Sequence, residues 1–287
     1  MKVEKNININ MPQMALGALS ESWFMKEIGD LHWELLCKGL NTNSFDLKND
    51  TDDRLYATFV RIRLNCSGNL HSFNENEKAT LESEISRFGK SMYFSEAEFK
   101  TKTDSIHATL MTTFSIRNAE DNTKLSKSEP HEVQFNIKQL PSLHEIGSGY
   151  RLLKKGILKS LQFNNLSFST ALPEDFLFQY QYELNPYYDL NGVNLLYFAA
   201  YPIINDFCEA KYFNSQDRFD SPWEQTYYTK YKDIFYYGNC NIQDSLIYKL
   251  IECEEISRGT FKLTSLLVRK GDNQIIARIL SVKTEAK

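Results

Sequence analysis

The sequence has no dense basic segment, no long apolar run and no Cys-x-x-Cys pair. Its 33 Lys and Arg residues stand against 37 Asp and Glu residues, a net charge of −4. A positive surface that would neutralise nucleic-acid phosphates is therefore not expected. The most apolar segment, residues 193–204, is too short to span a bilayer. We expect neither nucleic acid nor a membrane as a partner.

Cysteine pairing and export signals are missing as well. The five cysteines are spread singly, which argues against a zinc site and a disulfide framework, so no metal and no tightly bound cofactor is expected. The opening residues MKVEKNININ alternate charged and polar side chains, unlike a secretory leader. This composition predicts a cytoplasmic protein.

Histidine is confined to the first half, so a site built in the second half must work without imidazole. The chain also lacks G-x-S-x-G, G-x-G-x-x-G, P-loop and H-E-x-x-H motifs. These absences argue against an α/β serine hydrolase, a Rossmann oxidoreductase, an NTPase and a zinc peptidase. The chain is then either an enzyme whose active site has no common sequence signature, or a binding protein.

Residues 19–36, LSESWFMKEIGDLHWELL, have the apolar periodicity of a helix that buries one face. Ser20 is placed to cap it. Glu21 and His32 fall inside the apolar arc. Glu21 fits either favourable electrostatics at the helix start or a functional carboxylate. His32 fits either a hydrogen-bonded core histidine or a residue that lines a pocket.

Residues 54–64 alternate like a β-strand, and further strands are predicted at 91–100, 105–118 and 131–140. Alternation places Tyr56 on the more apolar face, together with Thr58, Val60, Ile62 and Leu64, and we expect this face to pack on the helix. One helix followed by several strands predicts an α+β fold in which an antiparallel sheet wraps a long central helix.

The second half repeats this order. Pro186 lies 174 residues after Pro12, and the pair Tyr197 and Phe198 follows the pair Trp23 and Phe24 at the same offset. The segments that end at Arg117 and Arg269 also share a pattern. A long period in two copies indicates a duplicated domain, with halves at 1–145 and 146–287 and a join in the segment that begins at Pro141.

Four motifs follow one another from near the N-terminus to about Asn241: MPQMALGALSESWFMKEIGDLHW, RLYATFVRIRL, LNPYYDLNGVNLLYFAAYP and FYYGNCN. They resemble a family of biosynthetic double hot-dog proteins that includes the decarboxylase/acyltransferase of leinamycin biosynthesis. The resemblance implies a double hot-dog fold of two tandem halves.

It further implies polyketide-like biosynthesis, with decarboxylation of a (methyl)malonyl-CoA-type thioester and transfer of the acyl group to an acyl carrier protein. Tyr56 matches the family's acylated tyrosine and would be the nucleophile. Acyl-CoA would be a substrate, and the carrier protein a partner. The helix start at residues 19–22 and its counterpart at residues 191–194 would supply N–H donors to the enolate oxygen.

A second group of polar residues would bind the substrate: Asn185, Asp189, Asn191 and Asn239, together with Ser20, Glu21 and His32. Ordinary turn chemistry explains the Asn-Pro, Asn-Gly and Gly-Asn pairs equally well.

Other functions stay open. A hot-dog thioesterase could use Glu21 as its base, whereas the dehydratase pattern of His with spaced Gly and Pro follows none of the five histidines. A non-catalytic protein that binds an acyl chain or a carrier protein is the remaining alternative. A homodimer is compatible with the sequence.

Overall fold

The structure is a computed structural model that describes residues 1–118, 120–131, 136–216 and 221–286. A twelve-stranded sheet dominates it, with the path β1-β5-β6-β7-β4-β13-β16-β15-β14-β12. The short strands β8 and β9 pair with β7 and β5. Pairing along the path is antiparallel, so the expected α+β class is confirmed.

The strands of the main sheet are β1 (Lys2–Asn8), β4 (Tyr56–Cys66), β5 (Lys78–Phe88), β6 (Met92–Lys100), β7 (Ser105–Arg117), β8 (Leu125–Lys127), β9 (Lys138–Gln139), β12 (Phe178–Glu183), β13 (Tyr227–Tyr236), β14 (Ser245–Ser257), β15 (Thr260–Arg269) and β16 (Ile275–Glu285). Two hairpins lie outside it, β2 (Met14–Ala15) with β3 (Ala18–Leu19) and β10 (Ser160–Phe163) with β11 (Leu166–Ser169). The helices are α1 (Glu21–Gly39), α2 (Glu145–Lys154), α3 (Pro186–Asp189) and α4 (Ala200–Asn214), with 3₁₀ turns at Met11–Gln13, Leu70–Ser72 and Trp223–Gln225.

Each half contributes the same strand order to the sheet, and the two halves meet where β4 pairs with β13. Read outward from this junction, β7, β6, β5 and β1 on one side correspond to β16, β15, β14 and β12 on the other. The pattern match between the segments ending at Arg117 and Arg269 was therefore wrong, because β7 and β15 are not equivalent. The predicted join at 145/146 falls at the start of α2.

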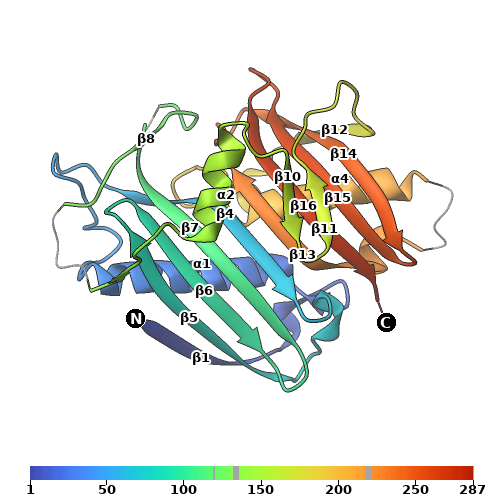
Figure 1. The fold of residues 1–287 in the computed structure, drawn as a ribbon, viewed down its shortest axis with the longest axis horizontal. Coiled ribbons are helices and arrows are strands. Elements are labelled where there is room, and N and C mark those ends of the chain that lie inside the picture. Colours follow the sequence, from blue (N-terminus) through green and yellow to red (C-terminus); the bar gives the residue numbers. More distant parts are fainter. Residues whose placement is uncertain (119, 132–135, 217–220, 287) are drawn as a thin grey trace.

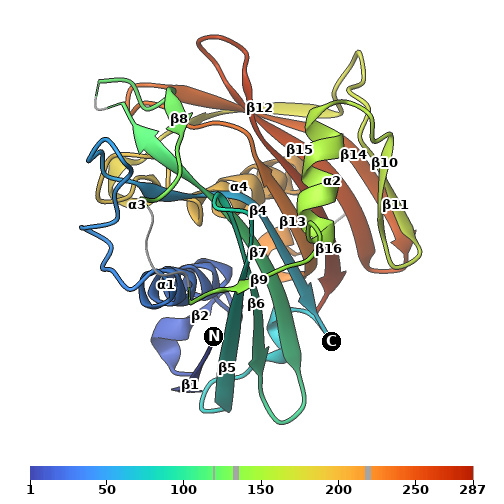
Figure 2. The same cartoon turned by 60° about the vertical axis from the view of Figure 1, so that its left-hand side comes forward.

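The sheet carries different elements on its two faces (Figure 1, Figure 2). The long helices α1 and α4 lie on one face, where Phe24 and Ile28 share a core with Ile204 and Cys208. On the opposite face, α2 and the β10–β11 hairpin cover a second apolar layer. None of the helices in the described ranges is long and apolar enough to cross a membrane.

Helix α1 forms as the sequence predicts. The Ser20 hydroxyl accepts a hydrogen bond from the Trp23 N–H at 3.3 Å, so Ser20 caps the helix. Glu21 and His32 are both buried, as their place in the apolar arc indicates.

The predicted face of β4 was wrong for Tyr56, because a β-bulge interrupts the strand between Phe59 and Arg61. Beyond the bulge, Ile62 packs in the core beneath α1, as expected. Before it, Phe59 occupies that side, whereas Val60 packs in the layer beneath α2. By alternation Tyr56 shares the face of Thr58 and Val60, away from α1.

Three of the four strands predicted in the first half are confirmed as β4, β6 and β7. The fourth, at 131–140, is reduced to the two residues of β9, and residues 132–135 lie outside the described part.

Candidate functional site

Two pockets lie at opposite ends of the β4–β13 ladder, beyond the pairs Asn65–Tyr231 and Arg61–Phe235. The first pocket, of about 410 Å³, lies between the start of α1, the middle of α4 and the start of β13. Its apolar lining includes Leu16, Leu19, Leu70, Ile203, Phe207, Ala210, Trp223 and Tyr227. A cavity of this size and character suits a small apolar ligand.

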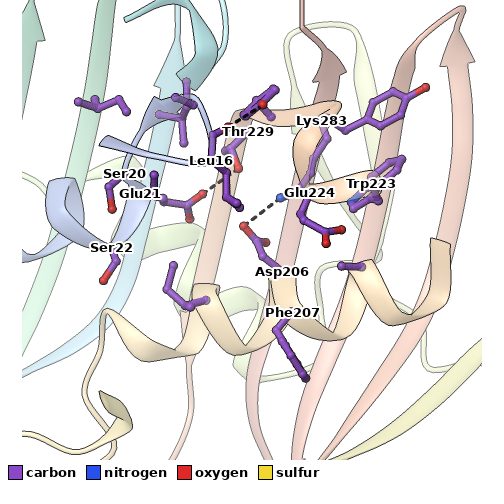
Figure 3. A pocket seen from close by; sticks show the side chains of 18 of the residues that line it. Leu16, Ser20, Glu21, Ser22, Asp206, Phe207, Trp223, Glu224, Thr229 and Lys283 are labelled. Carbon is purple, nitrogen blue, oxygen red and sulfur yellow. Dashed lines mark hydrogen bonds and ion pairs between the residues drawn. The ribbon is translucent and has the colours of Figure 1, made fainter. Parts of the chain in front are cut away.

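Glu21, Asp206 and Lys283 line the first pocket (Figure 3), and the buried Lys232, which is not a lining residue, pairs with both carboxylates. Lys232 Nζ lies 2.7 Å from Glu21 Oε1 and 2.8 Å from Asp206 Oδ1. Lys283 Nζ lies 2.9 Å from Asp206 Oδ2, and the Thr229 hydroxyl donates to Glu21 Oε2 at 2.8 Å. The elements α1, α4, β13 and β16, drawn from both halves, therefore build one charge cluster.

The cluster is electrostatically matched although it is buried. Burial raises the pKa of Asp206, but Lys232 and Lys283 outweigh burial and lower this pKa to about 2. Burial lowers the pKa of Lys232, and Asp206 and Glu21 together raise it above its usual value. Asp206 is thus held by two cations, whereas Glu21 is held by one.

Free backbone donors lie beside Glu21. The Phe24 N–H donates to the Ser20 carbonyl and the Trp23 N–H to the Ser20 hydroxyl. In the described part of the chain, the N–H groups of Glu21 and Ser22 have no partner, and both residues line the first pocket. A helix start of this kind favours negative charge, so it can stabilise an oxyanion.

The second pocket, of about 360 Å³, holds Tyr56. Tyr56 pairs with Ser115 and Ser115 with Lys127, so the three side chains stand in one row on the face that α2 covers. The guanidinium of Arg54 lies 5.0 Å from the centre of the Tyr56 ring. Among the described residues, the Tyr56 hydroxyl has no hydrogen-bond partner. Aromatic rings of Trp33, Tyr150, Tyr197, Phe198, Tyr201, Tyr236 and Tyr237 line the rest.

The four polar residues predicted to bind substrate make turn contacts. Asn185 accepts from the Tyr187 N–H, and Asp189 from the Asn185 N–H and the Tyr182 hydroxyl. Asn191 accepts from the N–H groups of residues 193 and 195, and Asn239 holds both the N–H and the carbonyl of Leu196. Asn191 and Asn239 border the second pocket, whereas Asn185 and Asp189 line neither pocket.

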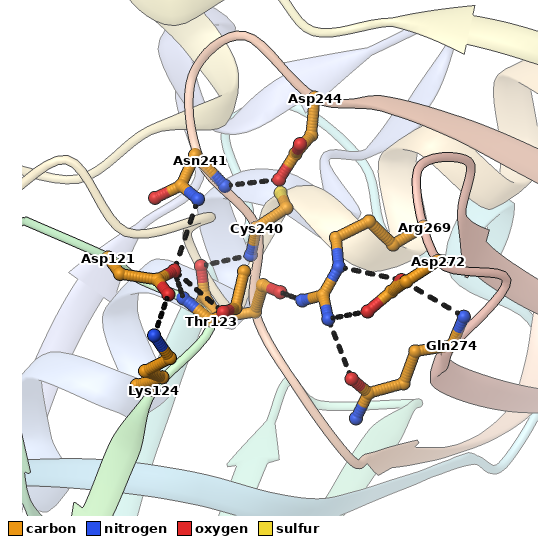
Figure 4. A network of polar contacts seen from close by, with 10 residues as sticks. Asp121, Thr123, Lys124, Cys240, Asn241, Asp244, Arg269, Asp272 and Gln274 are labelled. Atoms are coloured by element: carbon orange, nitrogen blue, oxygen red, sulfur yellow. Dashed lines mark hydrogen bonds and ion pairs between the residues drawn. The ribbon is translucent and has the colours of Figure 1, made fainter.

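A polar network secures the loops at the rim of the second pocket (Figure 4). Asn241 donates to Asp121, and Asp121 also accepts from the Thr123 hydroxyl at 2.6 Å. Arg269 donates to Asp272 and to the carbonyl of Asn239. The network ties the loop after β7 to the loop after β13, and we assign it a structural role.

His32 is a core residue, and the expectation that it lines a pocket was wrong. Its Nδ1 lies 2.7 Å from the Ser95 hydroxyl and its Nε2 2.8 Å from the Thr112 hydroxyl. Burial lowers the pKa of His32 to about 3. The ring is fully enclosed and belongs to the lining of neither pocket.

The sequence analysis missed Asp206, Lys232 and Lys283. A signal existed, because Asp206 interrupts the apolar run of α4 and Lys232 stands next to Asp233 in an otherwise aromatic and apolar stretch, residues 231–237. Charged side chains are seldom buried, so a charge at a position that the pattern predicts to be buried indicates an ion pair or a functional site.

Comparisons with known proteins concern the fold. No protein-family model matches the chain, and no curated protein matches it in sequence. The structure is similar to a putative oleoyl thioesterase from Lactobacillus plantarum (TM-score 0.65, 7% identity, 99% of this chain and 95% of that one). It is also similar to the 12:0-ACP thioesterase from Umbellularia californica (TM-score 0.64, 11% identity, 99% and 94%).

An acyl-ACP thioesterase from Bacteroides thetaiotaomicron is a third similar structure (TM-score 0.56, 10% identity, 98% and 97%). At these identities the likeness establishes the fold, and the chain has a hot-dog fold.

Proposed function

We propose that the protein hydrolyses acyl thioesters of coenzyme A or of an acyl carrier protein, with the first pocket as the active site. One observation carries the proposal: the Glu21 carboxylate lies beside two free N–H groups at a helix start, on the wall of a mostly apolar pocket. The likeness in fold to thioesterases that act on acyl-ACP adds to it. This is the thioesterase alternative of the sequence analysis, and it replaces acyl transfer as the leading function.

The reaction needs a base, an oxyanion site and a place for the acyl chain. Glu21 takes a proton from water as the water oxygen attacks the thioester carbonyl. The N–H groups of Glu21 and Ser22 bind the oxyanion of the tetrahedral intermediate. Its collapse breaks the C–S bond, and the proton on Glu21 passes to the leaving thiolate. The acyl chain lies against Leu19, Ile203 and Phe207.

The proposal includes the architecture. We assign a double hot-dog with halves at 1–145 and 146–287, in which α1 of the first half and α4 of the second supply one active site jointly. The strand order repeated outward from the β4–β13 junction supports this assignment. Such a site requires both halves.

Glu21→Gln tests the function. Removing a general base typically slows a reaction 10²–10⁴-fold, and we expect such a loss in kcat for acyl-CoA and acyl carrier protein substrates of several chain lengths. Release of free thiol is the measurement. Glu34→Gln, on the exposed face of the same helix, is the control and should keep full activity. No hydrolysis by the unmodified protein, or equal rates in both variants, rejects the proposal.

Acyl transfer through Tyr56 is the second candidate. Tyr56 lines the second pocket, and its hydroxyl has no hydrogen-bond partner among the described residues, so it is free to act as a nucleophile. A (methyl)malonyl thioester would lose CO₂ to give an enolate that takes the phenolic proton. The phenolate would then attack the resulting acyl thioester and release the coenzyme A thiolate, and a carrier-protein thiol would take the acyl group from Tyr56 and return its proton to the phenolate. Mass spectrometry of the protein after incubation with methylmalonyl-CoA should detect a propionyl adduct that Tyr56→Phe abolishes. An unmodified protein rules this candidate out.

A further inference from the structure

Arg278 is a buried cation without an anionic partner. It lies on β16 beside Phe235 and Leu266, in the layer that α2 and the β10–β11 hairpin cover, and only 5% of it is exposed. Among the described residues, its one hydrogen bond is a long one, 3.4 Å from Nη1 to the Ser169 carbonyl, and it makes no ion pair. Burial lowers the pKa of Arg278, whereas the pKa of Arg269, which is paired with Asp272, is raised.

Arg278 lines a cavity of about 640 Å³ between the end of α2, the segments on either side of the β10–β11 hairpin, and β16. Lys154 and Lys159 also line the cavity, and its described lining contains no Asp or Glu. Lys154 and Tyr237 belong to the second pocket as well, so the two spaces adjoin. Three cations therefore converge on a concave site that holds no counter-charge.

Burying an unpaired charge is unfavourable, and the other enclosed charges in the described part show how the fold offsets the cost. Lys232 lies between Glu21 and Asp206, and Arg61 is paired with Asp233 through two hydrogen bonds of 2.8 and 2.6 Å. Arg278 departs from this rule. An arginine fork with two nearby ammonium groups matches the oxygens of a phosphate group better than a single carboxylate.

We propose that Arg278, Lys154 and Lys159 form a binding site for the phosphate group of a phosphorylated small molecule. The site is separate from the first pocket and does not depend on the proposed hydrolysis. The 4′-phosphate of a pantetheine arm is one source of this chemistry, because the adjoining second pocket would receive the rest of the arm. The phosphates of a nucleotide are the other source.

Calorimetric titration of the full chain with inorganic phosphate, at constant ionic strength, tests the site. We expect saturable binding that Arg278→Met weakens at least tenfold and that Arg258→Met, which removes the same charge from an exposed turn, leaves unchanged. Hydrolysis in the first pocket should be equal in both variants. No saturable binding, or the same Kd in both variants, overturns the proposal.

Two further measurements keep the test decisive. If Arg278→Met does not fold, the double variant Lys154→Met/Lys159→Met removes two exposed cations from the same cavity and should weaken phosphate binding as well; binding unchanged in it counts against the site. Competition by 4′-phosphopantetheine, pantetheine and ADP then assigns the source. Displacement by either phosphorylated compound supports the site, and displacement by pantetheine as strong as by 4′-phosphopantetheine contradicts it.

Discussion

The two pockets stand at equivalent ends of one ladder, yet different chemistry fills them. Beside the first pocket, Glu21, Asp206, Lys232 and Lys283 form ion pairs across the two halves. In the second pocket, the ring centres of Phe198 and Phe59 lie 4.1 Å apart, and the enclosed ring of His32 lies 5.5 Å from that of Phe59 in the core beside the pocket. The two ends of the ladder thus differ: buried ion pairs border the first pocket, and aromatic rings make up much of the lining of the second.

The offset of 174 residues makes the difference specific. It matches Leu195 to Glu21 and His32 to Asp206, so an apolar side chain lines the second pocket at the position that matches Glu21, and an enclosed core histidine takes the position that matches Asp206. The hydrolysis proposed above therefore fits the first pocket, because the position in the second pocket that matches Glu21 carries no carboxylate.

Removing the central cation should have the largest effect. Lys232→Met leaves Glu21 and Asp206 buried without their shared counter-charge, and breaking a buried ion pair in this way typically costs about 3–5 kcal/mol. We expect a loss of that order in the free energy of unfolding, measured by urea denaturation. A loss of this size would show that the stability of the fold depends on the ion pairs that Lys232 forms beside the first pocket.

Lys230→Met is the matched control. Lys230 lies on the same strand and makes no ion pair among the described residues, so its replacement should change stability by no more than about 0.5 kcal/mol. Equal losses in the two variants would mean that charge pairing in the first pocket contributes nothing specific.

His32 gives a pH-dependent test of the core beside the second pocket. Its pKa is about 3 in the folded state and 6.5 in the unfolded chain, so below pH 6.5 the unfolded state binds the proton and the folded state does not. Stability is therefore lost as pH falls from 6.5 toward 3, by about 1.4 kcal/mol per pH unit. Between pH 6 and 4 the unmodified protein should lose about 2–3 kcal/mol more than His32→Gln.

The amide of His32→Gln retains hydrogen-bonding groups for Ser95 and Thr112 but does not titrate. His107→Gln, at an exposed histidine, should leave the pH dependence of the unmodified protein intact. Parallel curves for the unmodified protein and His32→Gln would show that His32 is not held neutral.

The sequence predicted helix α1, its Ser20 cap and the two polar residues on its apolar face, Glu21 and His32, because 3.6-residue periodicity and capping are local properties. The repeat was also detectable, since Pro186 and Pro12 both begin short turns before a long helix. By contrast, alternation failed at Tyr56, because a bulge is a property of strand pairing that one strand does not reveal. β5 went unpredicted although its apolar residues at 79, 81 and 85 alternate with polar ones, which is the pattern of a half-buried strand.

The charge cluster could not be assembled from the sequence for a related reason. Asp206, Lys232 and Lys283 lie far from Glu21 in the chain, and they meet only because β4 and β13 join the halves. Turn-forming residues misled in the opposite direction. Asn185 and Asp189 resembled a binding site by composition, but their side chains hold the backbone around a four-residue helix.

The smallest effect concerns the aromatic filling of the second pocket. A Cβ atom at Gly29 would lie 2.3 Å from Phe198 Cζ, so Gly29→Ala forces that ring to move. Overpacking costs about 1–3 kcal/mol, and the better helix propensity of alanine returns about 1 kcal/mol, so we expect a net loss of up to about 2 kcal/mol in urea denaturation. Phe198→Leu should relieve the clash, and the double variant should be more stable than the sum of the two single changes predicts.

Gly192→Ala, where an added Cβ meets no atom within 4 Å among the described residues, should stay within about 0.5 kcal/mol of the unmodified protein. Additive effects of Gly29→Ala and Phe198→Leu would mean that Phe198 does not hold its place against α1, and the contrast between a filled and an open pocket would fail.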